Sequence, residues 1–356
     1  MSDAQLTIQS HKGPYTAGFV AAIADALAHE KFADSHFIVD DRVMRLYPDA
    51  LAPIANAPSV LRLDATEDAK NLSRFSGYVS HLVGKGLRRD HILVAVGGGI
   101  IQDVTCFLAA TMLRGVPWRF IPTTLLAQAD SCIGSKSSIN ADAAKNILGT
   151  FTPPQDVRIC TKFLETLDEV DIRSGIGEIL KVHAIEGAEA FRALAVDYPR
   201  LASDRDLLEQ YIHRALEIKK PYIEEDEFDR GIRNIFNYGH SFGHALEAAT
   251  DFAIPHGIGV TMGMDMANFV AKRCYNRGAA FDRMHVTLRE NYRGFEGHPV
   301  PLDRFLTSIG KDKKNQGSNL MLILPDEDDH LAKTSRAADD AFVQACADFL
   351  SQGRLN

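Results

Sequence analysis

Three histidines lie close together in the C-terminal half of the sequence. His244 follows His240 by four residues, which places both on one face of a helix, and His256 lies twelve residues farther on. Neutral imidazoles at this spacing are common zinc ligands, and a catalytic zinc usually has three protein ligands and one open position. The alternative is that some of them are ordinary core or surface histidines. The spacing favours a metal site and by itself nominates all three.

An acid and a base precede this cluster. Glu178 and Lys181 stand one helical turn apart in SGIGEILKVHA, so their side chains project from the same helix face. The carboxylate could complete a metal site in which one histidine has another role. A plain salt bridge between the two residues is the alternative.

Several cations occur among small polar residues, where a solvated charged face is not expected. Arg233 and Asn237 lie seven and three residues ahead of His240, and Lys136 is surrounded by serine and glycine. Such groups could together bind a substrate that carries carboxylate or phosphate. The alternative for each lysine is a solvent-exposed surface residue without a role in binding. The other members of this set are Lys145, Asn146, Lys219, Lys220, Lys311, Lys313 and Lys314.

A run of three glycines, Gly97–Gly99, follows an apolar stretch and precedes a helical one. Backbone N–H groups at a helix N-terminus attract phosphate, and glycine allows it to approach closely. The turn could therefore bind a nucleotide, although it is equally compatible with a tight turn in any α/β protein. Asp103 could contact a ribose or amide group, or could simply be stabilised in the first helical turn. Thr123 and Thr124 end the next strand and could bind the same ligand or act as caps.

Two domains are expected to carry these residues, because 356 residues exceed what one small core needs. Short β-rich runs alternate with helical stretches in the first part, which predicts a doubly wound parallel sheet. Longer apolar-periodic stretches follow and predict a mainly helical second part. The expected strands are 36–41, 91–96 and 118–124, and the expected helices are 17–30, 104–115, 207–228 and 239–249. We place an α/β domain at 1–172 and a mainly helical domain at 173–356, with a cleft between them.

Composition excludes several classes of protein. The chain is 46% hydrophobic and 24% charged, with a formal net charge of -8, so it lacks the basic surface that nucleic-acid binding requires. The five cysteines are widely spaced and are expected to be reduced. The N-terminus does not resemble a secretory signal, and no apolar run reaches the roughly 18 residues needed to span a bilayer. A cytoplasmic enzyme is expected.

Five stretches of the sequence resemble, in their order and spacing, the motifs of the 3-dehydroquinate synthase family of sugar phosphate cyclases. They are VGGGIIQD, PTTLLAQAD, GEILK, NYGHSFGH and PHG. The resemblance implies a Rossmann-like NAD-binding α/β domain followed by a mainly helical domain that binds a divalent metal, zinc or cobalt. It implies Glu178, His240 and His256 as metal ligands, so His244 would instead contact the substrate phosphate and transfer a proton.

Further roles follow only from this resemblance. The implied NAD contacts are Asp40 or Asp41, Glu67, Lys70, Gly97, Gly98, Gly99, Asp103, Thr123, Thr124 and Lys145. The implied substrate contacts are Arg114, Asp130, Lys136, Asn146, Lys181, Lys219, Arg233, Asn237 and either Lys313 or Lys314.

The implied reaction oxidises a substrate hydroxyl with NAD, eliminates phosphate, returns the hydride and closes a carbocycle by an aldol step. The retained cations favour a carboxylated substrate, 3-deoxy-arabino-heptulosonate 7-phosphate, and a homodimer is expected. Two stretches depart from the family pattern: GSKSSIN replaces a GGKT-type stretch, and HGIGV replaces HGEAV, with Ile258 in place of an acid. The alternatives are a paralogous cyclase that uses sedoheptulose 7-phosphate, a metal-dependent polyol dehydrogenase, and a silent sugar-phosphate-binding protein.

Overall fold

The computed structural model describes residues 5–28, 30–142, 144–311, 315 and 319–354. The chain divides into two compact units: residues 1–167 with 219–229, and residues 168–218 with 230–356. The first break lies close to the expected boundary at 172/173. The segment Lys219–Asp229 belongs to unit 1, although it follows the first helices of unit 2 in sequence.

Unit 1 contains a seven-stranded sheet in the order β1-β2-β9-β6-β5-β3-β4, in which β1 is antiparallel and the other neighbours are parallel. The strands are β1 (Gln5–Ile8), β2 (Tyr15–Phe19), β3 (Ser35–Asp40), β4 (Val60–Leu63), β5 (Ile92–Gly97), β6 (Trp118–Pro122) and β9 (Asp156–Ile159). A separate hairpin pairs β7 (Lys136–Ala141) with β8 (Ala144–Phe151). The expected doubly wound α/β architecture of this part is confirmed.

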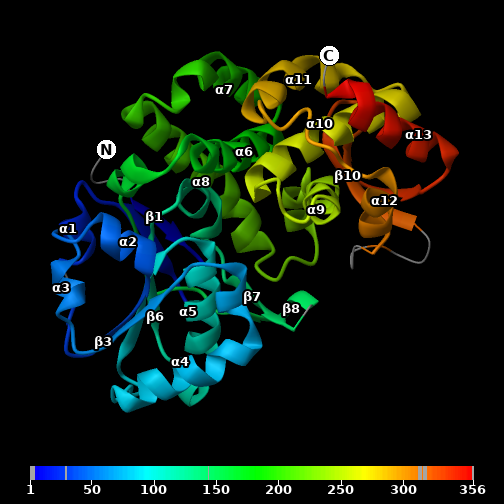
Figure 1. The fold of residues 1–356 in the computed structure, drawn as a ribbon. Coiled ribbons are helices and arrows are strands. Elements are labelled where there is room, and N and C mark those ends of the chain that lie inside the picture. Colours follow the sequence, from blue (N-terminus) through cyan, green and yellow to red (C-terminus); the bar gives the residue numbers. More distant parts are fainter. Residues whose placement is uncertain (1–4, 29, 143, 312–314, 316–318, 355–356) are drawn as a thin grey trace. The chain divides into compact units, whose positions relative to one another are not determined.

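Helices cover both faces of this sheet (Figure 1). They are α1 (Ile23–Ala26), α2 (Asp41–Leu46), α3 (Ala52–Ala55), α4 (Leu72–Gly84) and α5 (Gly99–Thr111), with shorter turns η1 (Glu67–Lys70), η2 (Met112–Arg114), η3 (Ala127–Ser131) and η4 (Thr161–Thr166). Phe37, Val39, Val94 and Val96 alternate along β3 and β5 and pack into one core with α1, α2 and α3. Ile38, Leu93 and Ala95 alternate with them and are also buried, and α5 packs against β3 and β5.

The helix expected at 17–30 is wrong over much of its length. Residues 17–19 belong to β2, in which Tyr15, Ala17 and Phe19 are buried in strict alternation, and only α1 is helical. The strand is stabilised by pairing with both β1 and β9. Tertiary pairing therefore overrides the helix-forming alanines of this stretch.

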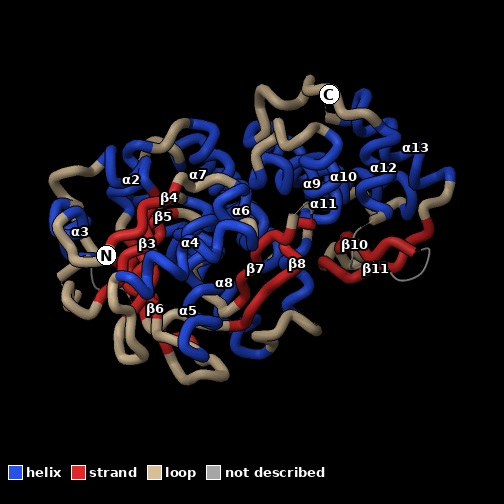
Figure 2. Tube along the Cα trace, turned by 60° about the horizontal axis from the view of Figure 1, so that its bottom comes forward, coloured by secondary structure: helices blue, strands red, loops and turns tan. Residues whose placement is uncertain are grey.

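Unit 2 is mainly helical, as expected (Figure 2). The helices are α6 (Glu169–Glu186), α7 (Ala188–Leu201), α8 (Arg205–Glu225, whose last turns belong to unit 1), α9 (His240–Ala249), α10 (His256–Tyr275), α11 (Ala279–Asn291), α12 (Leu302–Gly310) and α13 (Asp340–Asp348). Two turns, η5 (Ile232–Asn237) and η6 (Phe349–Gly353), and a hairpin of β10 (Asn319–Pro325) with β11 (Leu331–Ala337) complete it. The nearly fully buried α10 packs against α6, α9, α11 and α13.

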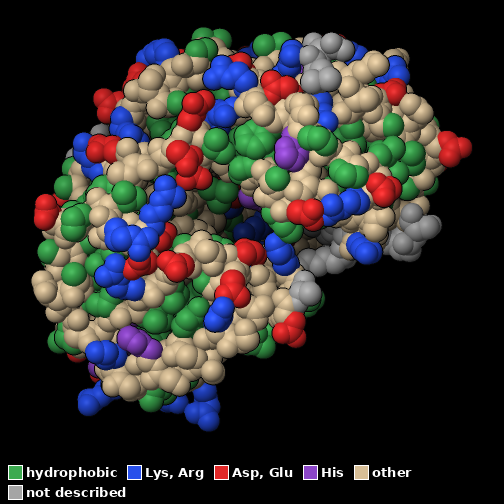
Figure 3. Space-filling view, in the orientation of Figure 1, with side chains coloured by type: hydrophobic (Ala, Val, Ile, Leu, Met, Phe, Trp, Pro, Cys, Tyr) green, Lys and Arg blue, Asp and Glu red, His purple; other side chains and the backbone are tan. Residues whose placement is uncertain are grey.

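Charged side chains of both signs lie on the surface of the protein. On the face shown in Figure 3, basic and acidic side chains are interspersed in each unit. No helix in the described part of the chain is long and apolar enough to cross a membrane.

A buried histidine in unit 1 should make stability depend on pH. The imidazole of His36 contacts Ser59 Oγ at 2.7 Å and His91 Nδ1 at 2.9 Å. Burial, followed by repulsion from His91 and His81, lowers the pKa of His36 to about 4. Between an ordinary pKa near 6.5 and this value only the unfolded chain binds the proton, so the free energy of unfolding should fall as the pH falls, by up to about 3 kcal/mol from this group.

Urea unfolding at pH 7.0 and pH 4.5 measures this effect. The His36→Gln variant should lose less stability between the two pH values than the wild type. A control variant, His330→Gln, changes a histidine whose side chain is 79% exposed and should keep the wild-type slope. Equal slopes in all three proteins would contradict the role of His36.

Candidate functional site

The glycine turn lies at the carboxyl edge of the sheet, where the strand order reverses between β3 and β5. Gly97 ends β5, and Gly98 is the N-cap of α5. Asp40 ends the neighbouring β3 and caps α2 by accepting a hydrogen bond from the Arg42 N–H at 2.9 Å. On the other side, the Thr123 N–H donates to the Gly97 carbonyl at 2.9 Å. Open α/β sheets bind ligands at such a switch point.

The glycines of this turn differ in the space around them. A Cβ atom at Gly97 would lie 2.5 Å from Ile101 Cγ1, and one at Gly98 would lie 2.9 Å from Thr124 Cγ2. A Cβ at Gly99 would meet no atom within 4 Å among the residues that the structure describes. Gly97 and Gly98 are thus required by packing, whereas Gly99 leaves open space at the first turn of α5.

Asp103 has a different setting from the one expected. It is the fifth residue of α5 and therefore lies beyond the first turn, so the helix N-terminus is not its main partner. Its carboxylate accepts from Lys70 Nζ at 2.7 Å and from the Ser138 N–H at 3.1 Å. Burial raises the pKa of Asp103, and the Lys70 ammonium opposes this. Glu67, 4.0 Å from Lys70 Nζ, accepts from Asn140 Nδ2 at 3.0 Å.

The expected NAD contacts thus fall into two groups. Asp40, Gly97–Gly99 and the two threonines line the sheet edge, where Thr124 Oγ1 also accepts from the Ala127 N–H at 3.3 Å and so acts as a cap. Glu67, Lys70 and Asp103 form a polar cluster beside the β7–β8 hairpin. Lys145 lies exposed on β8 of that hairpin.

The same hairpin carries two of the expected substrate contacts. Lys136 begins β7 and pairs with Asp229 at 2.5 Å. Asn146 has a left-handed backbone with φ 51°, and its Oδ1 accepts from Ser138 Oγ at 3.0 Å. Its N–H donates to Asn140 Oδ1 at 2.8 Å. Residues that the sequence analysis missed, Asn140 and Asp229, therefore hold the expected ones in place.

Two further expected substrate contacts meet in unit 1. Lys219 is buried and pairs with the Asp130 carboxylate at 2.8 Å, and its Nζ donates to the Asp130 carbonyl at 2.5 Å. Lys219 and Asp130 are 89 residues apart in sequence, so no local pattern could predict their contact. The pair explains why Lys219, near the end of α8, belongs to unit 1.

Arg114 is not brought to the glycine turn. It lies in η2, immediately after α5, and is exposed with φ 67°. The 13 residues of α5 span about 20 Å, so Arg114 lies near the opposite edge of the sheet. Its expected contact with the substrate stays a prediction.

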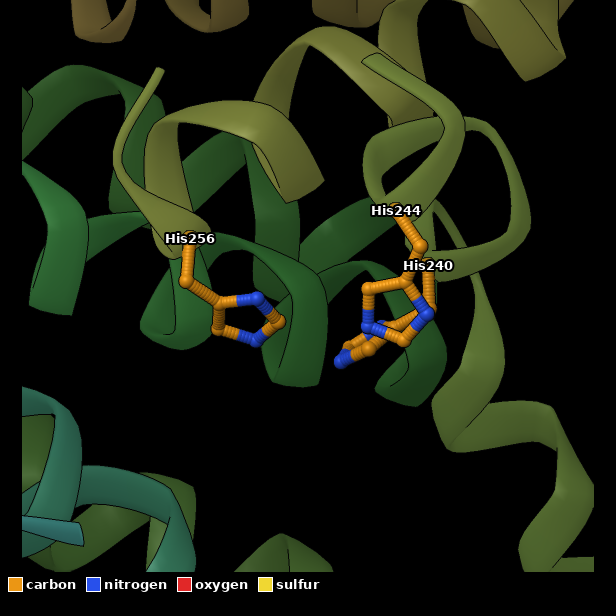
Figure 4. A group of neighbouring side chains, drawn as sticks. All are labelled: His240, His244 and His256. Atoms are coloured by element: carbon orange, nitrogen blue, oxygen red, sulfur yellow. The ribbon is translucent and has the colours of Figure 1, made fainter. Parts of the chain in front are cut away.

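In unit 2, four expected residues converge from three helices. Glu178 is on α6, His240 and His244 are on α9, and His256 begins α10. Potential ligand atoms of the three histidines all lie within 4.8 Å of one another (Figure 4). Glu178 Oε1 lies 3.4 Å from His256 Nε2 and 3.9 Å from His240 Nε2. The geometry thus contains both ligand sets considered from the sequence: the three histidines, and Glu178 with His240 and His256.

Close helix packing makes this convergence possible. Gly257 on α10 faces the Ser174 carbonyl of α6, and Gly263 on α10 faces the Gly239 carbonyl that precedes α9. A Cβ atom at either glycine would overlap that backbone. Ile258 follows Gly257 directly and is fully buried. At the position where the family pattern has an acid, this chain therefore has an apolar side chain in the interior.

The charges at this centre suit a cation. Burial would raise the pKa of Glu178, but Lys181 Nζ at 2.5 Å and His256 outweigh it and hold this pKa well below its usual range. Burial likewise opposes protonation of His256, but Glu178 and Glu247 raise its pKa to about 10. The acidic surroundings therefore keep a proton on His256, and a divalent cation could replace that proton.

The donor atoms also fit a metal ion. Both carboxylate oxygens of Glu178 are buried, and within the described part of the chain neither has a hydrogen-bond partner of good geometry. Carboxylate oxygen and imidazole nitrogen are ordinary ligands of zinc and cobalt. His240 Nδ1 lies 3.3 Å from the Tyr238 carbonyl, which leaves Nε2 as the ligand atom. His244 is the exposed member of the cluster.

The remaining expected contacts of unit 2 lie on α6 and η5. Lys181 is buried, with Nζ 5.7 Å from the centre of the Phe236 ring. Arg233 is buried at the start of η5, and Asn237 at its end donates to the Asn234 carbonyl at 2.9 Å. Lys313 and Lys314 lie outside the described residues.

Comparisons of sequence with known protein families give two adjoining matches. Residues 60–174 match the family described as 3-dehydroquinate synthase N-terminal, and residues 175–315 match 3-dehydroquinate synthase C-terminal. The 3-dehydroquinate synthase of Enterococcus faecalis is 35% identical over 300 residues, covering 81% of this chain and 82% of the relative. That of Cereibacter sphaeroides is 34% identical over 316 residues, covering 85% of each.

Solved structures of related cyclases share the fold. A 2-epi-5-epi-valiolone synthase from Streptomyces hygroscopicus with NAD⁺ and Zn²⁺ bound has a TM-score of 0.82 and 25% identity, covering 95% of this chain and 97% of that one. A 2-deoxy-scyllo-inosose synthase complexed with carbaglucose-6-phosphate, NAD⁺ and Co²⁺ has a TM-score of 0.80 and 21% identity, covering 98% and 99%.

Proposed function

The chain belongs to the 3-dehydroquinate synthase family, and on that premise we propose that it converts 3-deoxy-arabino-heptulosonate 7-phosphate to 3-dehydroquinate and phosphate. The observation that carries this proposal is the convergence of Glu178, His240 and His256 in unit 2. The glycine turn at the switch point of the sheet in unit 1 supports it. We also propose a cytoplasmic homodimer, as expected for this family.

NAD and a divalent metal are the cofactors of this proposal. NAD would accept a hydride and return it within one cycle, and the metal would act as a Lewis acid toward substrate hydroxyls. The sheet edge of unit 1, with Asp40, Gly99 and Thr123, would hold the dinucleotide. Glu178, His240 and His256 would hold the metal, with Glu178 ionised by its contact with Lys181.

The polar residues around these sites would bind and orient the substrate. His244, exposed beside the other two histidines, would move a proton as phosphate leaves. The ammonium groups of Lys136 and Lys219 are held by Asp229 and Asp130, so they can offer N–H donors to phosphate or carboxylate without large side-chain motions. Arg233 and Asn237 would contribute further donors in unit 2.

Substrate identity is testable with purified full-length protein, NAD and Zn²⁺. We expect phosphate release from the heptulosonate phosphate and a product identified as 3-dehydroquinate by mass and NMR. Release from sedoheptulose 7-phosphate instead would assign the chain to a paralogous cyclase. Net accumulation of NADH with a polyol would assign it to a dehydrogenase.

A further inference from the structure

His256 contacts a different carboxylate through each of its ring nitrogens. Nδ1 lies 2.9 Å from Glu247 Oε1, and Nε2 lies 3.4 Å from Glu178 Oε1. A neutral imidazole that donates from Nδ1 presents an unprotonated Nε2, which is the form that binds a metal. The contact with Glu247 thus determines which nitrogen faces the candidate metal site.

Glu247 is well placed to fix this ring. It is buried on α9, seven residues after His240 and therefore on the same helix face. Its carbonyl accepts from the Phe252 N–H at 2.7 Å, so its backbone is held at the end of the helix. Its side chain lies against Gly259, where a Cβ atom would come within 3.2 Å of Oε1.

We propose that Glu247 is a positioning residue for the metal site: it holds the Nδ1 side of His256 and directs Nε2 toward a divalent cation shared with Glu178 and His240. The proposal rests on the metal site of the proposed function. It adds a residue that acts through His256 and need not touch metal or substrate.

Unit 2 contains a matched pair that can serve as a control. Asp265 on α10 is fully buried and lies 2.8 Å from His285 Nδ1 on α11, and it also accepts from the Tyr292 hydroxyl at 2.7 Å. This carboxylate–histidine pair resembles that of Glu247 and His256 but includes none of the proposed ligands. Removing its charge should affect stability without directing any metal ligand.

The experiment compares metal binding by the full-length chain after metal removal with a chelator. Zinc affinity is measured by competition with a chromophoric chelator, and the ligand field is followed in the visible spectrum of the Co²⁺ form. The variants are Glu247→Gln, Glu247→Asp, His256→Ala and Asp265→Asn. We expect Glu247→Gln to weaken zinc binding by about 10- to 100-fold and to change the cobalt spectrum.

The other variants separate the possible outcomes. Glu247→Asp, which keeps the charge, should recover part of the affinity, and it decides the question if Glu247→Gln does not fold. Asp265→Asn should lower the melting temperature and leave zinc affinity unchanged. The inference is overturned if Glu247→Gln binds zinc as the wild type does, or if Asp265→Asn weakens binding equally. If His256→Ala also keeps full affinity, the proposed ligand set itself is wrong.

Discussion

Replacing Glu178 by glutamine is expected to lower turnover by about 1000-fold and to remove most bound zinc. The substitution removes the anionic ligand, and the Lewis acid of such a site supplies several kcal/mol, at about 1.4 kcal/mol for each factor of ten in rate. It also removes the carboxylate that faces the buried Lys181 ammonium at 2.5 Å. Breaking a buried ion pair in this way should reduce the free energy of unfolding of the metal-free protein by about 3–5 kcal/mol.

Phosphate release, zinc content and urea unfolding measure these effects separately. A matched control is Glu186→Gln at the end of the same helix, where the acid pairs with Arg214 near the surface. A surface pair contributes about 0–1 kcal/mol, so this variant should retain zinc, turnover and nearly all stability. Wild-type zinc content and turnover in Glu178→Gln would remove Glu178 from the ligand set.

Replacing Gly99 by valine is expected to reduce NAD affinity by about 100-fold, or about 3 kcal/mol, while the protein remains folded. Because a Cβ at this position meets no atom of the described residues within 4 Å, the side chain should occupy the space where the helix N-terminus would receive a pyrophosphate. Isothermal titration calorimetry with NAD gives the affinity, and thermal melting gives the stability.

The neighbouring Gly97 provides the contrasting variant. Gly97→Ala places a Cβ 2.5 Å from Ile101 Cγ1, so overpacking should lower the free energy of unfolding by about 1–3 kcal/mol and with it the melting temperature. The two adjacent substitutions thus separate cofactor binding from folding. Unchanged NAD binding in Gly99→Val would show that the dinucleotide does not lie against this turn.

Local sequence patterns predicted the parts of the site that depend on short spacing. The pair His240 and His244 is positioned by one helix, and Glu178 and Lys181 by another, so helical periodicity was enough to group each pair. The glycine turn followed from an apolar strand that leads directly into a helix. The doubly wound sheet and the helical second part were predictable for the same reason.

Contacts between distant segments could not be predicted in this way. The pairing of Lys219 with Asp130 and of Lys136 with Asp229 depends on the return of residues 219–229 to unit 1. Helical periodicity places Glu247 on the face of His240, yet its contact with His256 requires the packing of α9 against α10.

Local propensity also misled in places. Residues 17–30 are rich in alanine, but pairing with two strands makes their first part β2. The hairpin of β10 and β11 was not expected, because the long helical patterns around it dominated that half of the sequence. The first-turn position expected for Asp103 was wrong because α5 begins at Gly99.

A turnover experiment with NAD held well below the substrate concentration tests the central claim most directly. If NAD accepts and returns a hydride within each cycle, every molecule of heptulosonate phosphate should release one phosphate, and no NADH should remain at the end. Turnover that stops after one equivalent of NAD, with NADH accumulating, would contradict a redox-neutral cyclase.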